Sequence, residues 1–197
     1  AKKYLPDKGI YVRRNYISSE RLLNEENINL DFKEIKTISI TSGSIGHEDD
    51  FKMIQKPLEN ILRKYKNLEL VLLGKFKKSL FSKAINERIK SHIEFQEYEN
   101  YIKSLSETDI SLIPIKKSSF NECKSIVRLL DCCNAGVPSI ASDIGDYRDS
   151  YDTMPFFEIA SDNEWEEKIC KLIEDSSLRE FYSENSREFI KSISSGF

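Results

Sequence analysis

The residues best suited to chemistry lie in the stretch 118–149, SSFNECKSIVRLLDCCNAGVPSIASDIGDYRD. Lys124, Arg128 and Asp131 are spaced i, i+4 and i+7, so on a helix they would lie within about 40° of one another on one face. Lys124 and Ser125 would fall in the first helical turn, where free N–H groups favour an anion. Asp131 would follow about 10 Å further along, a span that fits a diphosphate at one end and a ribose hydroxyl at the other. The alternative is a solvated helix face with a simple Arg128–Asp131 pair.

A helix over about residues 121–135 must present these side chains. Asn121 is an N-cap candidate, because its side chain can accept from the N–H groups of the first turn. Gly136 can take the left-handed conformation that ends a helix, and Pro138 suits the start of the following strand. The apolar face of this predicted helix is formed by Ile126, Leu129, Leu130 and Cys133.

Further candidates follow other predicted strands. Ser42, Gly43 and Ser44 form a small-residue loop that lets backbone N–H groups approach a phosphate, and His47 of the same loop could orient a sugar or a phosphate. Lys75 follows a strand-ending glycine and could meet a diphosphate, and Glu94 and Phe95 could hold a base. The competing interpretations are an exposed loop histidine and a solvated basic turn.

Strand-like and helix-like segments alternate from residue 37 onward. Apolar runs such as LELVLLG (68–74) and DISLIPI (109–115) are typical of strands covered on both faces. The pattern predicts an α/β fold, a doubly wound parallel sheet of about six strands with helices on both faces. Ligands of such sheets bind at the carboxyl ends of the strands, where the candidates above converge. The predicted strands are 37–42, 68–74, 92–98, 109–115, 138–142 and 153–160, and the predicted helices are 50–65, 79–91, 98–108, 121–135 and one or two after 163.

The first 35 residues differ from the rest, with one strand-like run at 10–17 and a polar remainder. We expect 1–35 to be a linker segment between domains and 36–197 to be the ligand-binding domain.

Composition excludes several function classes. The 197-residue chain has a net charge of −3 and a pI near 5.6, which argues against a nucleic-acid partner. No apolar run reaches the roughly 18 residues of a membrane span, and no signal peptide is recognisable, so we expect a cytoplasmic protein. The cysteine and histidine spacing predicts no metal site. A nucleophile motif is lacking, and the cluster Asp143, Asp146 and Asp149 leaves a carboxylate-pair glycosidase open.

Three segments in order, SGSIGHEDDF, LELVLLGK and FNECKSIVRLLDCCNAGVPSIASDIGDYRD, resemble the C-terminal, donor-binding half of GT-B-fold glycosyltransferases of the group 1 type. The resemblance covers about residues 10–190. Its most specific part is K-S-x-x-R-x-x-D at 124–131 followed by NAGVPSIAS, and His47-x-x-Asp50-Phe51 adds to it. The family's glutamate that binds the donor ribose is replaced by Asp131. Eight positions earlier, where much of the family has a second glutamate, stands Cys123, with Glu122 one step off.

The resemblance implies a Rossmann-like half of a GT-B fold and a hexosyltransferase that builds a surface polysaccharide. It implies a nucleotide-diphosphate sugar as donor without metal or other cofactor, and a glycan or lipid-linked acceptor bound by an N-terminal half, without which this domain would be inactive. The full-length enzyme would then work in the cytoplasm or at the inner face of the membrane. His47 and Lys124 are the implied catalytic candidates. The implied donor-binding residues are Ser42, Gly43, Ser44, Lys75, Glu94, Phe95, Asn121, Lys124, Ser125, Ile126 and Asp131.

Two alternatives remain open at this point. The same two-domain architecture serves sugar-nucleotide epimerases, and a similar sheet serves non-catalytic nucleotide-binding or interaction modules.

Overall fold

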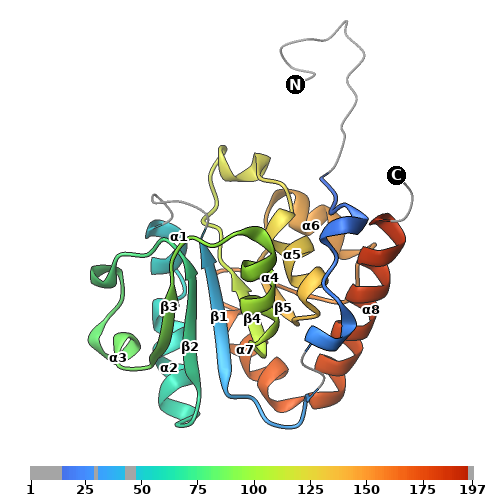
Figure 1. Ribbon diagram of the computed structural model, residues 1–197. Coiled ribbons are helices and arrows are strands. Elements are labelled where there is room, and N and C mark those ends of the chain that lie inside the picture. Colours follow the sequence, from blue (N-terminus) through green and yellow to red (C-terminus); the bar gives the residue numbers. More distant parts are fainter. Residues whose placement is uncertain (1–14, 29–30, 43–47, 195–197) are drawn as a thin grey trace, which may run out of the picture.

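Six parallel strands form one sheet in the computed structural model, which describes residues 15–28, 31–42 and 48–194 (Figure 1). Their order is β3-β2-β1-β4-β5-β6, and every neighbouring pair is parallel. Strands β2 and β3 follow β1 on one side, and β4, β5 and β6 follow on its other side. The order therefore reverses between β1 and β4, which is the topological switch point of the sheet. The strands are β1 (Thr37–Ser42), β2 (Glu69–Gly74), β3 (Ile89–Ile93), β4 (Ile110–Ile113), β5 (Ser139–Ser142) and β6 (Glu158–Ala160).

Helices cover both faces of this sheet, which confirms the predicted doubly wound α/β fold (Figure 1). On one face, α5 (Val127–Ala135) packs against α4 (Tyr98–Ser106) and α8 (Ser176–Ser194). On the other, α2 (Gln55–Lys64) packs against α7 (Trp165–Glu174). The shorter helices are α1 (Glu48–Lys52), α3 (Lys83–Asn86) and α6 (Gly145–Tyr151), with 3-10 turns at Ser19–Arg21, Glu25–Asn27, Lys78–Leu80 and Asn121–Cys123.

The central strands are buried along their whole length, as a sheet between two helical layers requires. Every residue of β1, β4 and β5 is buried. Of the small polar residues there, Ser39 has its Oγ 3.0 Å from the hydroxyl of Thr108, which donates to the Leu105 carbonyl at 2.7 Å.

The predicted helix over 50–65 is wrong in one respect, because two helices, α1 and α2, replace it. Pro57 explains the break. In one continuous helix its ring would clash with the carbonyl of Met53, four residues earlier. With α2 starting at Gln55, Pro57 falls in the first turn, where its missing N–H is harmless.

Other element boundaries also differ from the prediction, and the strand expected over 153–160 is reduced to β6. The helix expected over 79–91 is reduced to α3, because β3 begins at Ile89 rather than at residue 92 and pairs with β2 from Leu70 onward. The polar stretch after β5, where no helix was predicted, contains α6, whose Tyr147 is buried. Of the strand expected over 10–17, residues 10–14 lie outside the described residues, and 15–17 form no strand.

The described part of the predicted linker lies along α5 and α8 (Figure 1). The Ser194 hydroxyl donates to the Ile17 carbonyl at 2.6 Å, and Arg187 forms a 3.2 Å ion pair with Glu25. Buried Arg179 donates to the carbonyls of Leu172 at 2.6 Å and of Phe32. This segment is therefore packed onto the domain, and the division at residue 35 remains a prediction.

Candidate functional site

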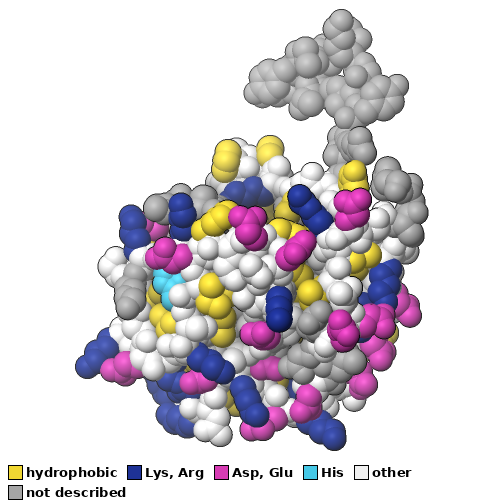
Figure 2. Space-filling model, in the orientation of Figure 1, with side chains coloured by type: hydrophobic (Ala, Val, Ile, Leu, Met, Phe, Trp, Pro, Cys, Tyr) yellow, Lys and Arg dark blue, Asp and Glu magenta, His cyan; other side chains and the backbone are white. Residues whose placement is uncertain are grey.

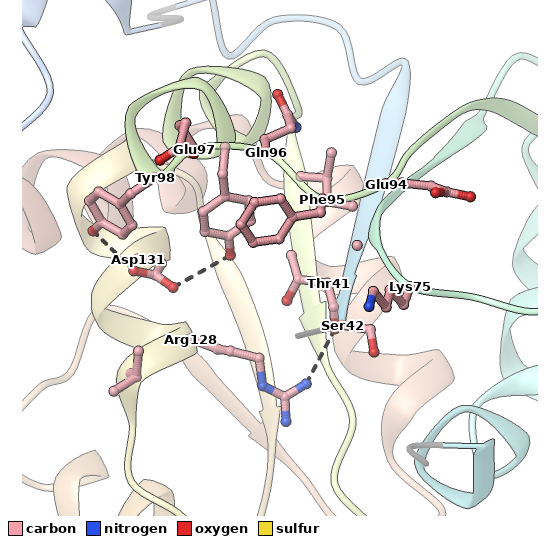
Figure 3. Close-up of a pocket in the computed structure, with 14 residues that line it drawn as sticks. Thr41, Ser42, Lys75, Glu94, Phe95, Gln96, Glu97, Tyr98, Arg128 and Asp131 are labelled. Atoms are coloured by element: carbon pink, nitrogen blue, oxygen red, sulfur yellow. Dashed lines mark hydrogen bonds between the residues drawn. The ribbon is translucent and has the colours of Figure 1, made fainter. Parts of the chain in front are cut away.

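A cavity of about 500 Å³ opens at the carboxyl ends of β1 and β2, between these ends, the β3–α4 connection and α5 (Figure 3). It lies beside the switch point of the sheet, and its volume is that of small-molecule sites, about 300–1,000 Å³. Its lining residues are Thr41, Ser42, Leu73, Gly74, Lys75, Glu94, Phe95, Gln96, Glu97, Tyr98, Tyr101, Val127, Arg128 and Asp131.

Asp131 supplies a buried carboxylate to this cavity, with only 6% of its surface exposed. Tyr98 Oη donates to Oδ1 at 3.1 Å and Tyr101 Oη to Oδ2 at 3.5 Å (Figure 3). Burial raises the pKa of Asp131 to about 6, because desolvation outweighs these two hydrogen bonds and the charge of Arg128. A ligand hydroxyl that donates to this carboxylate would favour its charged form.

Two cations flank the end of β1 in the same cavity. Arg128 Nη1 donates to the Thr41 carbonyl at 3.4 Å (Figure 3). The Lys75 backbone N–H donates to the Ser42 carbonyl at 3.2 Å, so the Lys75 side chain starts beside the same strand end. A guanidinium and an ammonium placed this way can bind a phosphate or diphosphate.

Aromatic side chains line the opposite wall. Phe95 is 80% exposed although it borders the cavity, and Tyr98 and Tyr101 lie with ring centroids 6.3 Å apart. Because an aromatic ring offers an apolar face to a planar partner, Phe95 can stack on a base. The cavity thus combines a stacking ring, a hydroxyl acceptor and two cations.

The structure brings five of the predicted site residues together in this cavity. They are Ser42, Lys75, Glu94, Phe95 and Asp131. Gly43, Ser44 and His47 lie outside the described residues. Asn121, Lys124, Ser125 and Ile126 do not line the cavity.

The helix predicted from Asn121 begins only at Val127, and Asn121 does not cap it. Residues Asn121–Cys123 form a separate 3-10 turn, and the N-cap position of α5 is Ile126. Lys124 therefore lies before the helix and shares no helical face with Arg128 and Asp131. The end of the helix is as predicted, since Gly136 adopts a left-handed conformation with φ of 68°.

Buried Asp50 explains why the residues before α5 take another conformation. Its Oδ1 accepts from the Lys116 N–H at 2.7 Å, and its Oδ2 lies 3.6 Å from Lys124 Nζ. Asn121 Nδ2 donates to the Lys116 carbonyl at 2.6 Å and approaches Asp50 Oδ1 at 3.4 Å. These bonds to α1 hold residues 116–124 in a loop, and a helix starting at Asn121 would break them.

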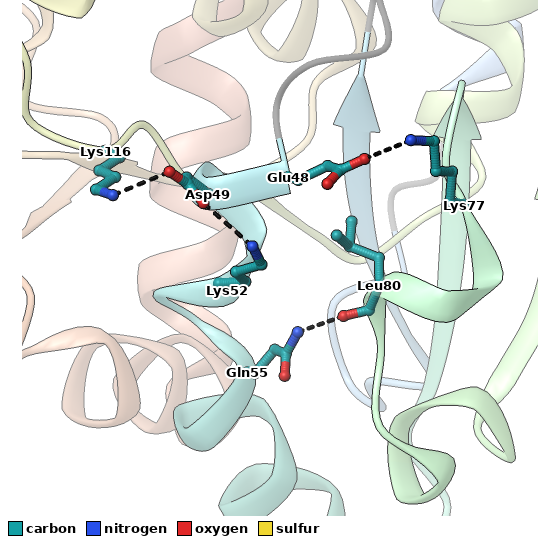
Figure 4. Close-up of polar contacts among 7 residues, drawn as sticks. All are labelled: Glu48, Asp49, Lys52, Gln55, Lys77, Leu80 and Lys116. Carbon is teal, nitrogen blue, oxygen red and sulfur yellow. Dashed lines mark hydrogen bonds and ion pairs between the residues drawn. The ribbon is translucent and has the colours of Figure 1, made fainter.

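We expect Asp50→Ala to destabilise the domain by about 2–3 kcal/mol, because it leaves a buried N–H donor without its charged acceptor. Hydrogen exchange of the Lys116 amide should accelerate as the loop loosens. Asp49→Ala is the matched control, since Asp49 is exposed and pairs with Lys116 Nζ at 3.0 Å and Lys52 Nζ at 3.3 Å (Figure 4). Such surface pairs contribute at most about 1 kcal/mol. Equal effects of the two substitutions would contradict this role of Asp50.

Three cavity residues with side-chain hydrogen bonds to Asp131 or to the end of β1 were not among the predicted donor-binding residues: Tyr98, Tyr101 and Arg128. The two tyrosines are three residues apart and so share one face of α4. Their position after a strand at the ligand-binding rim is a usable signal. What the sequence does not reveal is that α4 packs against α5 and so turns this face toward Asp131.

The described residues contain no group of three or more His, Cys, Asp and Glu side chains that could hold a metal ion. Of the carboxylates left open for a glycosidase, Asp143 pairs with Arg148, and Asp146 and Asp149 belong to α6. None of the three lines the cavity. Within the described ranges, no helix is both long and apolar enough to cross a membrane.

Known structures share this fold. WaaG, a glycosyltransferase involved in lipopolysaccharide biosynthesis, matches with a TM-score of 0.69 and 16% identity over 91% of this chain and 51% of WaaG. The C-terminal domain of the group 1 glycosyl transferase LpcC from Francisella tularensis matches with a TM-score of 0.64 and 19% identity, over 90% of this chain and 94% of that domain. Anabaena Alr3699/HepE, in complex with UDP and glucose, matches with a TM-score of 0.66 and 12% identity, over 90% and 51%.

This chain therefore spans about half the length of WaaG and HepE. No curated protein matches its sequence significantly. The family model "Glycosyl transferases group 1", however, matches residues 24–189, most of the chain. The chain thus has the fold of the LpcC C-terminal domain and belongs to the glycosyl transferases group 1 family.

Proposed function

We propose that this domain binds the nucleotide-diphosphate sugar donor of a hexosyltransferase in the cavity at the ends of β1 and β2. The observation that carries the proposal is that Asp131, Arg128 and Lys75 all line this one cavity. The relatives that crystallised with UDP, TarM of S. aureus and HepE, have the same fold.

Each part of such a donor has a partner of matching chemistry. The ribose hydroxyls donate to Asp131, whose carboxylate favours hydroxyl donors when buried. The diphosphate lies against Arg128 and Lys75 at the end of β1, and the base stacks on Phe95 at the mouth. Because two cations neutralise the diphosphate, binding needs no divalent metal.

Charge stabilisation is the main contribution of this domain to the transfer. As the bond from the sugar to the diphosphate breaks, negative charge grows on the leaving diphosphate, and preorganised cations stabilise that charge. Arg128 and Lys75 take the role first expected for Lys124, which lies 3.6 Å from Asp50 instead. The acceptor, a glycan or a lipid-linked sugar, approaches from the other half of the enzyme, and this domain alone is inactive.

The proposed setting is surface polysaccharide biosynthesis, in the cytoplasm or at the inner face of the membrane. A nucleic-acid partner is not proposed, because acidic and basic side chains are mixed on the face shown in Figure 2 and form no continuous basic stripe there.

Calorimetric titration with UDP, GDP, ADP and their sugar conjugates tests the proposal. One nucleotide should bind, with the same affinity in EDTA and in magnesium. Arg128→Ala should weaken its binding at least tenfold, as expected when a charged hydrogen-bond donor is lost. Arg63→Ala, which removes an exposed arginine from α2, is the control and should change nothing. Failure of every nucleotide to bind, both to this domain and to the full-length enzyme, would overturn the proposal.

A further inference from the structure

The segment 19–24 contacts the same tyrosine that holds the buried carboxylate of the cavity. The Arg21 guanidinium carbon lies 5.4 Å from the centroid of the Tyr98 ring. Tyr98 Oη donates to Asp131 Oδ1 at 3.1 Å. Arg21 and Asp131 are thus joined by a single side chain, although 110 positions separate them in the sequence.

A second residue, buried Asn134, fixes this segment at that place. Its Oδ1 accepts from the Leu23 N–H at 2.9 Å, and its Nδ2 donates to the Arg21 carbonyl at 2.9 Å. The same Nδ2 lies 3.4 Å from Tyr98 Oη. Asn134 follows Asp131 by three residues on α5, so both project from one side of that helix. The backbone of 19–24 is therefore held by the helix that carries the carboxylate.

We propose that Arg21 is a positioning residue of the donor site, which orients and polarises Tyr98 and through it sets the geometry and charge of Asp131. The inference rests on the proposed function, because it assigns Asp131 to the donor. Arg21 lies outside the stretch that matches the family, residues 24–189, so the family match does not extend to this residue.

The physical effect has a definite sign. A cation over a phenol ring is attracted to its face and withdraws electron density from the hydroxyl, which makes that hydroxyl a better donor to a carboxylate. A stronger bond to the charged form favours ionised Asp131. Without Arg21, Tyr98 would also lose one contact that fixes its ring. The titratable and charged groups that interact with Asp131 are Tyr98 and Tyr101 from α4, Arg128, Cys132 and Cys133 from α5, and Tyr147 from α6.

The test compares Arg21→Ala, Arg21→Lys and the wild-type domain by two measurements. The first is the pH titration of the Asp131 carboxyl carbon by NMR in the ligand-free protein, assigned by its loss in Asp131→Asn. We expect the midpoint to rise in Arg21→Ala and to remain near wild type in Arg21→Lys. The second is calorimetry with the nucleotide that binds. Affinity should fall about two- to fivefold in Arg21→Ala, as for a lost exposed cation–π contact, with a larger loss at pH 6 than at pH 8.

Lys103→Ala is the matched control, because Lys103 is an exposed cation on α4. Equal shifts of the Asp131 titration in Arg21→Ala and Lys103→Ala would overturn the inference, as would no shift in Arg21→Ala. Equal affinity losses at pH 6 and pH 8 would mean that Arg21 only supports the fold, and would also overturn it. The carboxyl titration needs no nucleotide. A domain that shows the shift, when neither it nor the full-length enzyme binds any nucleotide, would refute the proposed function and support the coupling of Arg21 to Asp131.

Discussion

Gly74→Ala is expected to destabilise the domain by more than about 3 kcal/mol. A Cβ atom at Gly74 would lie 1.8 Å from the Ser42 carbonyl oxygen, and the φ of Gly74 is +109°. A side chain in such a region adds about 1–3 kcal/mol of strain, and the clash is with backbone, so the ends of β1 and β2 would have to separate. That loss is a large fraction of a typical stability of 5–15 kcal/mol. Urea denaturation measures it.

Gly136→Ala is the control for backbone strain without a clash against the backbone. Gly136 also has a positive φ, of 68°, but the three atoms nearest to an added Cβ would belong to side chains rather than to the backbone: Arg187 Cδ at 2.9 Å, Ile28 Cγ2 at 3.0 Å and Ser183 Oγ at 3.2 Å. A loss of only about 1–2 kcal/mol is expected there, from the left-handed backbone itself. If Gly74→Ala is no more destabilising than Gly136→Ala, the close approach of the two strand ends does not limit stability.

The sheet could be predicted from the sequence because its signals are local. Continuous apolar runs such as that of β2, followed by helical periodicity, allow few arrangements other than a parallel sheet. Boundaries were less predictable where distant residues decide them. The start of α5 depends on Asp50, which holds Asn121 and Lys124 in a loop from more than 70 positions away. The break before α2 was predictable in principle from Pro57 alone.

The candidate site was predictable only in part, for a related reason. Strand ends in a parallel sheet converge on one rim, so Ser42, Lys75 and Phe95 could be placed there from the order of the strands. The tyrosines that bind Asp131 come from α4, and their contact depends on how α4 packs on α5. The sequence motif identifies the carboxylate, whereas the packing of two helices determines its environment and its pKa.

Asp131→Asn is expected to make the ligand-free domain more stable at pH 8. Burial raises the folded-state pKa of Asp131 from 3.8 to about 6, so the folded state prefers the protonated form more than the unfolded state does. The free energy of unfolding of the wild type therefore falls as the pH rises from about 4 to about 6. A shift of about two units corresponds to at most about 3 kcal/mol. Asparagine does not titrate. The difference in free energy of unfolding between the variant and the wild type should therefore grow from about pH 4 to about pH 6 and stay constant above that. Urea denaturation at pH 4 and pH 8 measures the difference.

The same substitution is expected to weaken nucleotide binding at pH 8 by about 5- to 150-fold, because the ribose hydroxyls lose a charged acceptor worth about 1–3 kcal/mol. Wild-type affinity should also decline below pH 6, as Asp131 takes up a proton, whereas that of the variant should not. Asp149→Asn, at an exposed position of α6, is the control for both measurements. If Asp131→Asn makes the domain more stable but its nucleotide binding weaker, the fold keeps a desolvated carboxylate at a cost in stability because the ligand needs it. If the variant binds the nucleotide as tightly as the wild type, the assignment of Asp131 to the donor site is wrong, whatever the stability of the variant. A carboxylate that contacts the donor cannot be neutralised without a loss of affinity.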